Sequence, residues 1–124
     1  MSLTVRTEQR GDVVVVSVAG ELDLATAPEL QDQITDLLDR GHNRLVFDLA
    51  DVSFCDSTGL SVFVRARNSC DKTGGVVRLA APQRGLLRIL EVSGLVEALR
   101  TNPTVDEALA GDTSAGPSTD ASAR

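Results

Sequence analysis

The sequence contains no tryptophan or tyrosine and only three phenylalanines among its 124 residues. Few aromatic rings are therefore present to stack on bases or sugars, which argues against nucleic-acid and small-ligand binding. Basic residues are also in deficit, since 18 acidic residues face 12 basic ones and the net charge is −6. A surface of this sign repels phosphate backbones and anionic lipids, so we expect neither nucleic acid nor a membrane as a partner.

Long apolar runs are missing as well. No stretch approaches the roughly 20 apolar residues that span a bilayer, and the N-terminus lacks a basic segment followed by an apolar one. We therefore expect a cytoplasmic protein. The two cysteines, Cys55 and Cys70, are too few for a disulfide framework or a thiolate metal site, and we expect both to be reduced.

Catalytic residue types are equally sparse. A Ser-His-Asp site would have to use His42, the single histidine, and the chain has no nucleophile elbow, Walker A loop or dinucleotide-binding fingerprint. Acidic loop residues are more often solvated than bound to Mg²⁺. We therefore expect no enzyme activity, no cofactor and no metal site, although the chain has loop carboxylates at Glu21, Asp23, Asp48, Asp51 and Asp56.

The first 55 residues alternate strand and helix patterns. Strands are predicted over residues 3–10 and 13–18, joined by a turn at Gly11-Asp12, and residues 20–23 form a connection. Apolar residues at helical spacing then predict an amphipathic helix over residues 25–40, which ends at a glycine. A buried strand over residues 44–49 follows, and we expect residues 51–55 to form a loop.

A run of helix-capping residues, Asp56-Ser57-Thr58-Gly59, opens the next segment. It predicts a helix that begins at or next to Ser57 and continues to Lys72. A strand over residues 76–80 follows, and Pro82 is expected to start a third helix. The apolar face of this third helix is expected to comprise Leu86, Leu87, Ile89, Leu90 and Val92.

The end of the chain changes character. Residues 95–99 are interpreted as an edge strand, and residues 105–110 as a last helix. Residues 111–124 contain no large apolar side chain, so we expect a disordered polar tail after a single domain over residues 1–110. The complete pattern predicts an α/β fold with a mixed, mainly parallel sheet of about five strands, covered by about four helices.

Three motifs now carry a resemblance. The run from Leu45 to Leu60 includes the Asp-Ser-Thr-Gly tetrad, Gly-Glu-Leu-Asp precedes it at residues 20–23, and Leu-Glu-Val-Ser-Gly-Leu follows at residues 90–95. In this order and spacing they resemble the STAS family, and they are most similar to the bacterial anti-sigma factor antagonists. The resemblance extends from residue 3 to about residue 110.

The resemblance implies a partner-switching role. An unphosphorylated antagonist of this kind binds an anti-sigma factor, which is a serine kinase of the GHKL type, and so frees a sigma factor. The kinase phosphorylates the serine after the aspartate, which is Ser57 here, and a PP2C-type phosphatase reverses the modification. Thr58 provides a second hydroxyl beside it. The expected partner-binding residues are Asp23, Asp56, Ser57, Thr58 and Gly59.

Other interpretations stay open. Ser57 would also suit an N-cap role, although the flanking motifs favour a phosphate acceptor, and Asp23 would suit a cap of the helix that follows it. Gly59 has a low helix propensity, which close approach by a partner would explain. The fold also suits a STAS subunit of a transporter or lipid-trafficking complex, and the acidic loops suit a nucleotide-binding protein or enzyme. Because the strong apolar positions are all assigned to core faces, we expect a monomer when the protein is alone.

Overall fold

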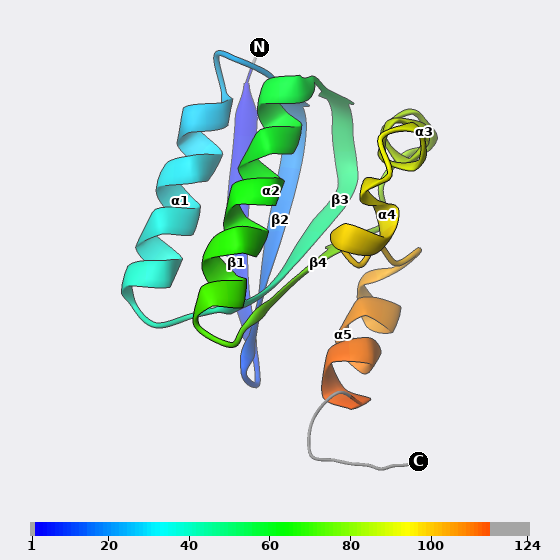
Figure 1. Cartoon of the computed structure of the whole chain (residues 1–124). Coiled ribbons are helices and arrows are strands. Elements are labelled where there is room, and N and C mark those ends of the chain that lie inside the picture. Colours follow the sequence, from blue (N-terminus) through cyan, green and yellow to red (C-terminus); the bar gives the residue numbers. More distant parts are fainter. Residues whose placement is uncertain (1, 115–124) are drawn as a thin grey trace.

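The computed structural model describes residues 2–114. Within them, four strands form one sheet and five helices surround it (Figure 1). In chain order the elements are β1 (Leu3–Arg10), β2 (Val13–Leu22), α1 (Ala27–Asp39), β3 (Arg44–Cys55), α2 (Ser57–Lys72), β4 (Val76–Ala80), α3 (Arg84–Val92), α4 (Leu95–Ala98) and α5 (Val105–Ser114).

The sheet has the order β1-β2-β3-β4. The opening hairpin pairs β1 with β2 antiparallel, from Leu3 opposite Gly20 to Arg10 opposite Val13. Its tight turn uses Gly11 at φ +64°, a backbone conformation that glycine adopts readily. The pairs β2–β3 and β3–β4 are parallel, which confirms the prediction of a mixed, mainly parallel sheet.

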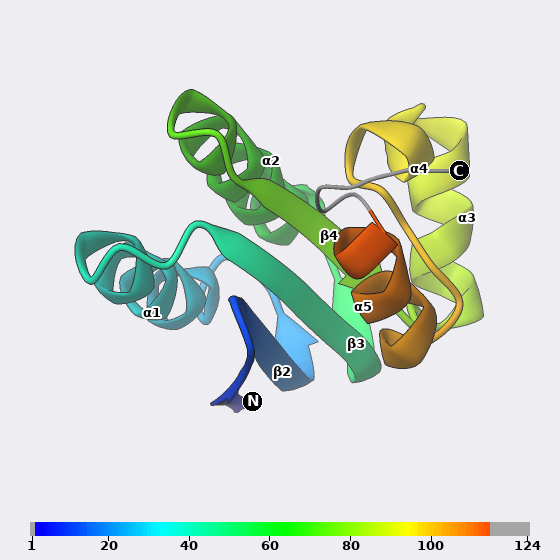
Figure 2. The same cartoon turned by 90° about the horizontal axis from the view of Figure 1, so that it is seen from below.

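Helices cover both faces of the sheet. On one face, α1 and α2 bury Ile34 and Phe63 against the strands, and the Phe63 ring contacts the Phe47 ring edge-on at a centroid distance of 5.1 Å. On the other face, α5 buries Ala108 beside Val46. The short helices α3 and α4 lie next to the β3 and β4 end of the sheet (Figure 2).

The expected fifth strand over residues 95–99 is wrong. After Gly94 at φ +75°, one helical turn bonds the Leu99 amide to the Leu95 carbonyl at 2.9 Å, and the Leu99 side chain enters the main core. A single β-bridge joins Ala80 to Asn102 at the outer edge of β4. A short run of apolar residues fits a buried helical turn as well as a strand, so periodicity alone did not separate them.

Two other boundaries differ from the prediction because the strands are longer than expected. β2 continues to Leu22 through the expected connection, and β3 continues to Cys55 through the expected loop. Two irregularities in the β2–β3 pairing, each with one extra residue on β3, disrupt the alternation that would have indicated a strand.

The C-terminal helices also differ from the prediction. Helix α3 begins at Arg84, two residues after Pro82, and Ile89 and Val92 are exposed instead of buried. Helix α5 extends to Ser114, so the first four residues of the expected tail are helical. The rest of that expected tail lies outside the described residues.

Candidate functional site

The predicted site residues lie at the ends of two neighbouring parallel strands. Leu22 at the end of β2 pairs with Cys55 at the end of β3. The backbone amide of Asp56 donates to the carbonyl of Leu22 at 3.1 Å. The structure therefore brings together the β2–α1 connection, which contains Asp23, and the start of α2, which contains Ser57.

Asp56 is the N-cap of α2. Its backbone is extended, its carboxylate Oδ1 accepts from the Gly59 amide at 3.0 Å, and its carbonyl accepts from the Leu60 amide at 3.0 Å. The N-cap role considered for Ser57 thus belongs to Asp56. Ser57 is the first helical residue, its side chain is exposed, and its hydroxyl has no hydrogen-bond partner within residues 2–114. This serine is presented to solvent at a helix N-terminus.

Thr58 has a different environment from Ser57. It is half-buried and lines a groove between α1 and α2, together with Leu24, Pro28 and Val62. The groove has a volume of about 250 Å³. Of the two adjacent hydroxyl groups, that of Ser57 is therefore the more accessible to an enzyme.

Gly59 is buried under the strand ends. A Cβ atom at this position would lie 2.7 Å from Leu22 Cγ and 2.8 Å from Cys55 Sγ, closer than real side chains approach. The fold itself therefore accounts for a glycine here, and close approach by a partner is not needed to explain it.

Asp23 organises the connection before α1. Its carboxylate Oδ1 accepts from the amides of Ala25 and Thr26, both at 3.0 Å. The buried Thr26 hydroxyl donates to the Glu21 carbonyl at 2.7 Å and accepts from the Asp23 amide at 3.0 Å. These bonds fix the turn before α1, while Asp23 itself stays half-buried. The N-cap of α1 is Thr26, without a side-chain cap bond, so the expected capping of the helix by Asp23 is wrong and its carboxylate stabilises the preceding turn instead.

Cys55 lies beneath the start of α2. Burial, and secondarily the Asp56 carboxylate, raise the pKa of the Cys55 thiol to about 12. Burial and Asp71 raise the pKa of the Cys70 thiol to about 11. Both cysteines are free and buried, as expected, and neither thiol is activated for nucleophilic chemistry.

Among residues 2–114, no three acidic, histidine or cysteine side chains cluster in a way that could bind a metal ion. Nor does any helix within that range combine the length and apolar character that crossing a bilayer requires.

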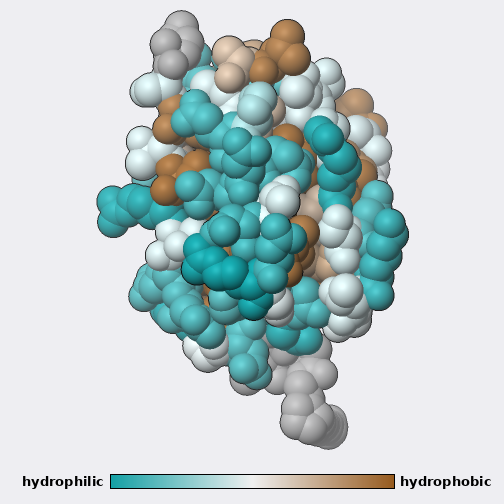
Figure 3. Space-filling view, turned by 90° about the vertical axis from the view of Figure 1, so that its left-hand side faces the viewer, coloured by the Kyte–Doolittle hydropathy of each residue, from teal (hydrophilic) through white to brown (hydrophobic). Residues whose placement is uncertain are grey.

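Exposed apolar side chains also occur outside the expected partner-binding residues. Leu24, in the β2–α1 connection, is 74% exposed. On the side covered by α1 the surface is mainly hydrophilic, with a hydrophobic patch at the upper end, where this connection runs (Figure 3). Phe54, Ile89 and Val92 are exposed on the α3 side. In the sequence, a large apolar residue in a predicted connection, such as Leu24, is the feature that could have indicated an exposed apolar contact.

Comparisons with known proteins agree with this arrangement. The STAS domain family model matches residues 4–108. The anti-sigma-B factor antagonist of Bacillus subtilis is 34% identical over 99 residues, which cover 80% of this chain and 90% of that protein. A homologue from Staphylococcus epidermidis with the same name is 29% identical over 102 residues, covering 82% and 94%.

Solved structures show the same similarity. An anti-sigma factor antagonist from Mycobacterium paratuberculosis superposes with a TM-score of 0.79 at 32% identity, over 91% of this chain and 96% of the other. A crystal structure from Thermotoga maritima gives a TM-score of 0.85 at 26% identity, over 89% and 95%. The family model spans most of the chain, including both strand ends and the start of α2, and the chain therefore belongs to the STAS domain family.

Proposed function

We propose that this protein is an anti-sigma factor antagonist that binds an anti-sigma factor kinase of the GHKL type and is released when Ser57 is phosphorylated. Binding of the kinase frees the sigma factor, and a PP2C-type phosphatase restores the binding form. The observation that carries the proposal is the exposed Ser57 hydroxyl at the start of α2, in a chain whose relatives are named anti-sigma-B factor antagonists.

The local structure favours Ser57 as the phosphate acceptor. The hydroxyl is free of internal hydrogen bonds within the described residues, so no bond has to break before transfer. A phosphate attached there would meet the positive end of the α2 dipole, which favours negative charge. Thr58 faces the α1–α2 groove instead, and we expect it to remain unmodified.

The proposed docking face consists of Asp23, Asp56, Ser57, Thr58 and Gly59. Their roles differ. Asp23 and Asp56 shape the two connections through their hydrogen bonds, and Gly59 lets α2 approach β2. Leu24 and the α1–α2 groove add apolar area beside these polar residues, and a polar rim around apolar contacts is typical of protein interfaces.

Phosphorylation would act on the interface more than on the fold. In the free protein the phosphate is solvated and close to helix amides. In a complex it would be enclosed beside Asp56, and an unpaired buried charge costs several kcal/mol. Since about 1.4 kcal/mol is a tenfold change in affinity, we expect a loss of about a hundredfold or more.

The test uses the purified chain and each GHKL-type serine kinase encoded in its source genome. With ATP present, one kinase should transfer phosphate to the wild type but not to Ser57→Ala, whereas Ser61→Ala should be modified normally. Thr58→Val, a variant within the docking face, should still accept phosphate at Ser57. Ser57→Ala should bind that kinase in the presence of ATP, and the phosphorylated wild type should bind at least a hundredfold more weakly.

Two results would overturn the proposal. One is a Ser57→Ala protein that accepts phosphate as the wild type does. The other is a phosphorylated protein that binds the kinase with unchanged affinity. Asp23→Asn and Asp56→Asn keep the acceptor oxygens and remove the charges, so they show separately whether these carboxylates contribute to docking through charge.

A further inference from the structure

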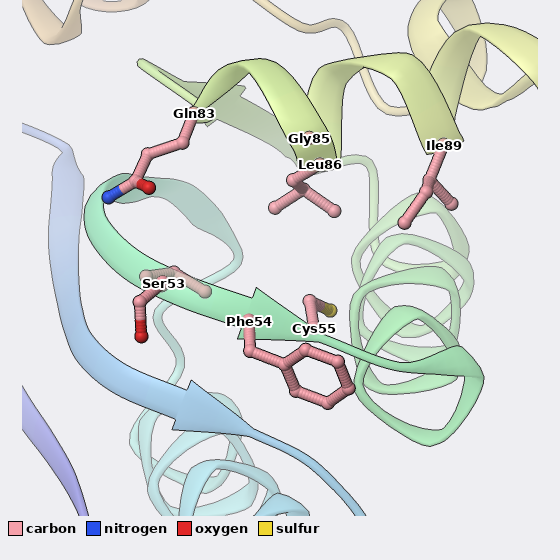
Figure 4. A pocket seen from close by; sticks show the side chains of 8 residues that line it. Ser53, Phe54, Cys55, Gln83, Gly85, Leu86 and Ile89 are labelled. Carbon is pink, nitrogen blue, oxygen red and sulfur yellow. The ribbon is translucent and has the colours of Figure 1, made fainter.

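A second apolar surface lies beyond Ser57, between the end of β3 and helix α3. We call it the α3 groove. It has a volume of about 170 Å³, and its walls include Phe54, Cys55, Gln83, Gly85, Leu86 and Ile89. Figure 4 shows the side chains of Leu86 and Ile89 directed from α3 toward β3, and Cys55 directed back toward them. Cys55 also lies against the start of α2, and none of the other residues belongs to the polar site around Ser57.

An irregularity in β3 exposes Phe54. Val52 pairs with Gly20, but the next pair joins Phe54 to Glu21, which leaves Ser53 as an extra residue. In a regular strand, Val52 and Phe54 would point to the same face, so Phe54 would be buried with Val52. The bulge breaks this alternation, so the Phe54 side chain is 53% exposed at the rim of the groove, with its ring directed away from α3 (Figure 4).

Helix α3 supplies the opposite wall. Gly85, Ile89 and Val92 share one face of the helix at spacings of four and three residues, and Ile89 and Val92 are 42% and 79% exposed. A Cβ atom at Gly85 would meet no atom within 4 Å, so the missing side chain keeps the groove open. Apolar residues of β3 and α3, among them Cys55, Leu86 and Ile89, therefore line one concave surface, and exposed apolar side chains lie beside it, which is typical of an interaction site.

Two arginines of α3 lie close to the groove along the helix. Arg88 lies three residues after Gly85 and four before Val92, so it borders the same face of α3. Arg84 lies one turn earlier, and within residues 2–114 neither arginine forms an ion pair. The chain as a whole has a net charge of −6, but Arg88 places a positive charge beside the apolar groove. A partner group that matches both features is an apolar side chain with a carboxylate close to it.

We propose that the α3 groove receives an apolar side chain of the partner that docks at Ser57, and that a neighbouring carboxylate of this partner pairs with Arg88. The proposal rests on the proposed function for the identity of the partner. The two surfaces are continuous, because Cys55 lines the groove and its Sγ lies 3.6 Å from the carbonyl of Asp56, the N-cap of α2. One partner can therefore contact both.

The first test measures kinase affinity with groove variants. Ile89→Ala removes part of the α3 wall, Phe54→Ala removes the exposed ring at the rim, and Gly85→Leu fills the groove from a helix position that tolerates a side chain. Each should weaken binding of the kinase that modifies Ser57 by at least tenfold, and KM for phosphorylation should rise while kcat is retained. Gly85→Leu should melt no lower than the wild type, which separates lost docking from lost folding.

Charge variants complete this test. Arg88→Glu should weaken binding about tenfold or more, whereas Arg10→Glu, the same charge change on β1, should have little effect. Unchanged affinity in Ile89→Ala and Gly85→Leu would overturn the proposal.

The second test needs no kinase. The dye 8-anilinonaphthalene-1-sulfonate combines apolar rings with an anion, as the proposed occupant does. Added to the folded wild type, it should shift the NMR amide signals of Phe54, Gly85 and Ile89, and Gly85→Leu and Arg88→Glu should reduce these shifts. The absence of shifts at these residues would contradict the groove assignment, whether or not Ser57 is phosphorylated by a kinase.

A second copy of the chain is the competing occupant. Light scattering of the protein alone should show a monomer at concentrations up to about a hundred micromolar. A dimer that Gly85→Leu dissociates would assign the groove to self-association and overturn the proposal. Failure of Ser57 phosphorylation, by contrast, would overturn the proposed function and leave the dye experiment to decide on the groove.

Discussion

The backbone amide of Asp56 donates to the carbonyl of Leu22 at 3.1 Å, and the Leu22 side chain also lies against Gly59. Leu22 thus contacts both the N-cap and the first turn of α2. The relative position of the β2–α1 connection and Ser57 depends on this residue, which is fully buried. The proposed docking face is therefore built on the core and not on flexible loops.

The Gly59→Ala variant tests this close contact. Alanine favours helix formation over glycine by about 1 kcal/mol, but its methyl group would overlap Leu22 and Cys55. Overpacking of a well-packed core typically destabilises by about 1–3 kcal/mol, so we expect a net loss of stability in urea unfolding. Gly85→Ala is the matched control, because its methyl group has free space, and it should be neutral or stabilising.

Replacement of Asp56 by alanine and by asparagine should have different effects on stability. Asp56→Ala removes the acceptor for the Gly59 amide and should destabilise the protein by about 1 kcal/mol, the usual value for an N-cap. Asp56→Asn keeps the acceptor and should unfold near the wild-type denaturant concentration. Equal destabilisation by both variants would show that the carboxylate charge, and not the cap hydrogen bond, stabilises α2.

The fold could be predicted largely from patterns in which one face of an element is buried. The hairpin, α1, α2 and the parallel strands follow from such patterns. Residues 51–55 could not be identified as a strand, because the bulge at Ser53 places Ser53 and Phe54 consecutively on the exposed side. Residues 95–99 were too short for periodicity to distinguish a helical turn from a strand.

The candidate site could be predicted only in part from the sequence. The motif around Ser57 indicated a capped helix start, and the structure places that cap at Asp56. The internal reason for Gly59 could not be read from the sequence, because Leu22 is 37 residues away along the chain and meets Gly59 only through the β2–β3 pairing. The α3 groove was missed because Ile89 and Val92 fit the apolar pattern of a buried face.

The two thiols should make stability depend on alkaline pH. In the folded protein the thiol pKa is about 12 for Cys55 and about 11 for Cys70, whereas the pKa of an unfolded thiol is near 9. Raised folded pKa values contribute stability below pH 9 that is lost as pH rises through the folded values. The unfolding free energy should fall by up to about 1.4 kcal/mol per pH unit per thiol in this window.

Denaturation at pH 8 and pH 10 measures this effect, and Cys70→Ala is expected to reduce the difference. In the wild type and in Cys70→Ala, an alkylating reagent at pH 8 should modify the cysteines of the unfolded protein quickly and those of the folded protein slowly. Rapid modification of Cys55 in the folded protein would contradict its burial and its raised pKa.

The last turn of α5 should contribute to stability. Gly111 lies against Arg78 of β4, since a Cβ atom there would be 3.3 Å from the arginine Nη1, and Ala108 is buried on the sheet. A chain ending at Ala110 loses this turn, whereas a chain ending at Ser114 keeps it. We expect the shorter chain to melt several degrees lower, about 4–8 °C for each kcal/mol lost in a domain of this size. Equal melting temperatures would show that α5 packs only through its first two turns.

Phosphorylation of Ser57 should change binding far more than stability. A phosphoserine adds about −1.5 to −2 charges at the N-terminus of α2, where negative charge is favoured by about 0.3–1 kcal/mol. Repulsion from the adjacent Asp56 acts in the opposite direction, and both effects are screened because Ser57 is exposed. Ser57→Asp should therefore melt within a few degrees of the wild type, as should the neutral control Ser57→Asn.

Binding should separate these two variants. Ser57→Asp places a charge where the partner would have to desolvate it, so its affinity for the kinase should fall by a factor of ten or more, and Ser57→Asn should lose less. Because the charge in the complex is buried, added salt should restore little of the affinity. If 0.5 M salt returned Ser57→Asp to wild-type affinity, the charge would lie at a solvated rim of the interface, and the switch would act through long-range repulsion instead of desolvation.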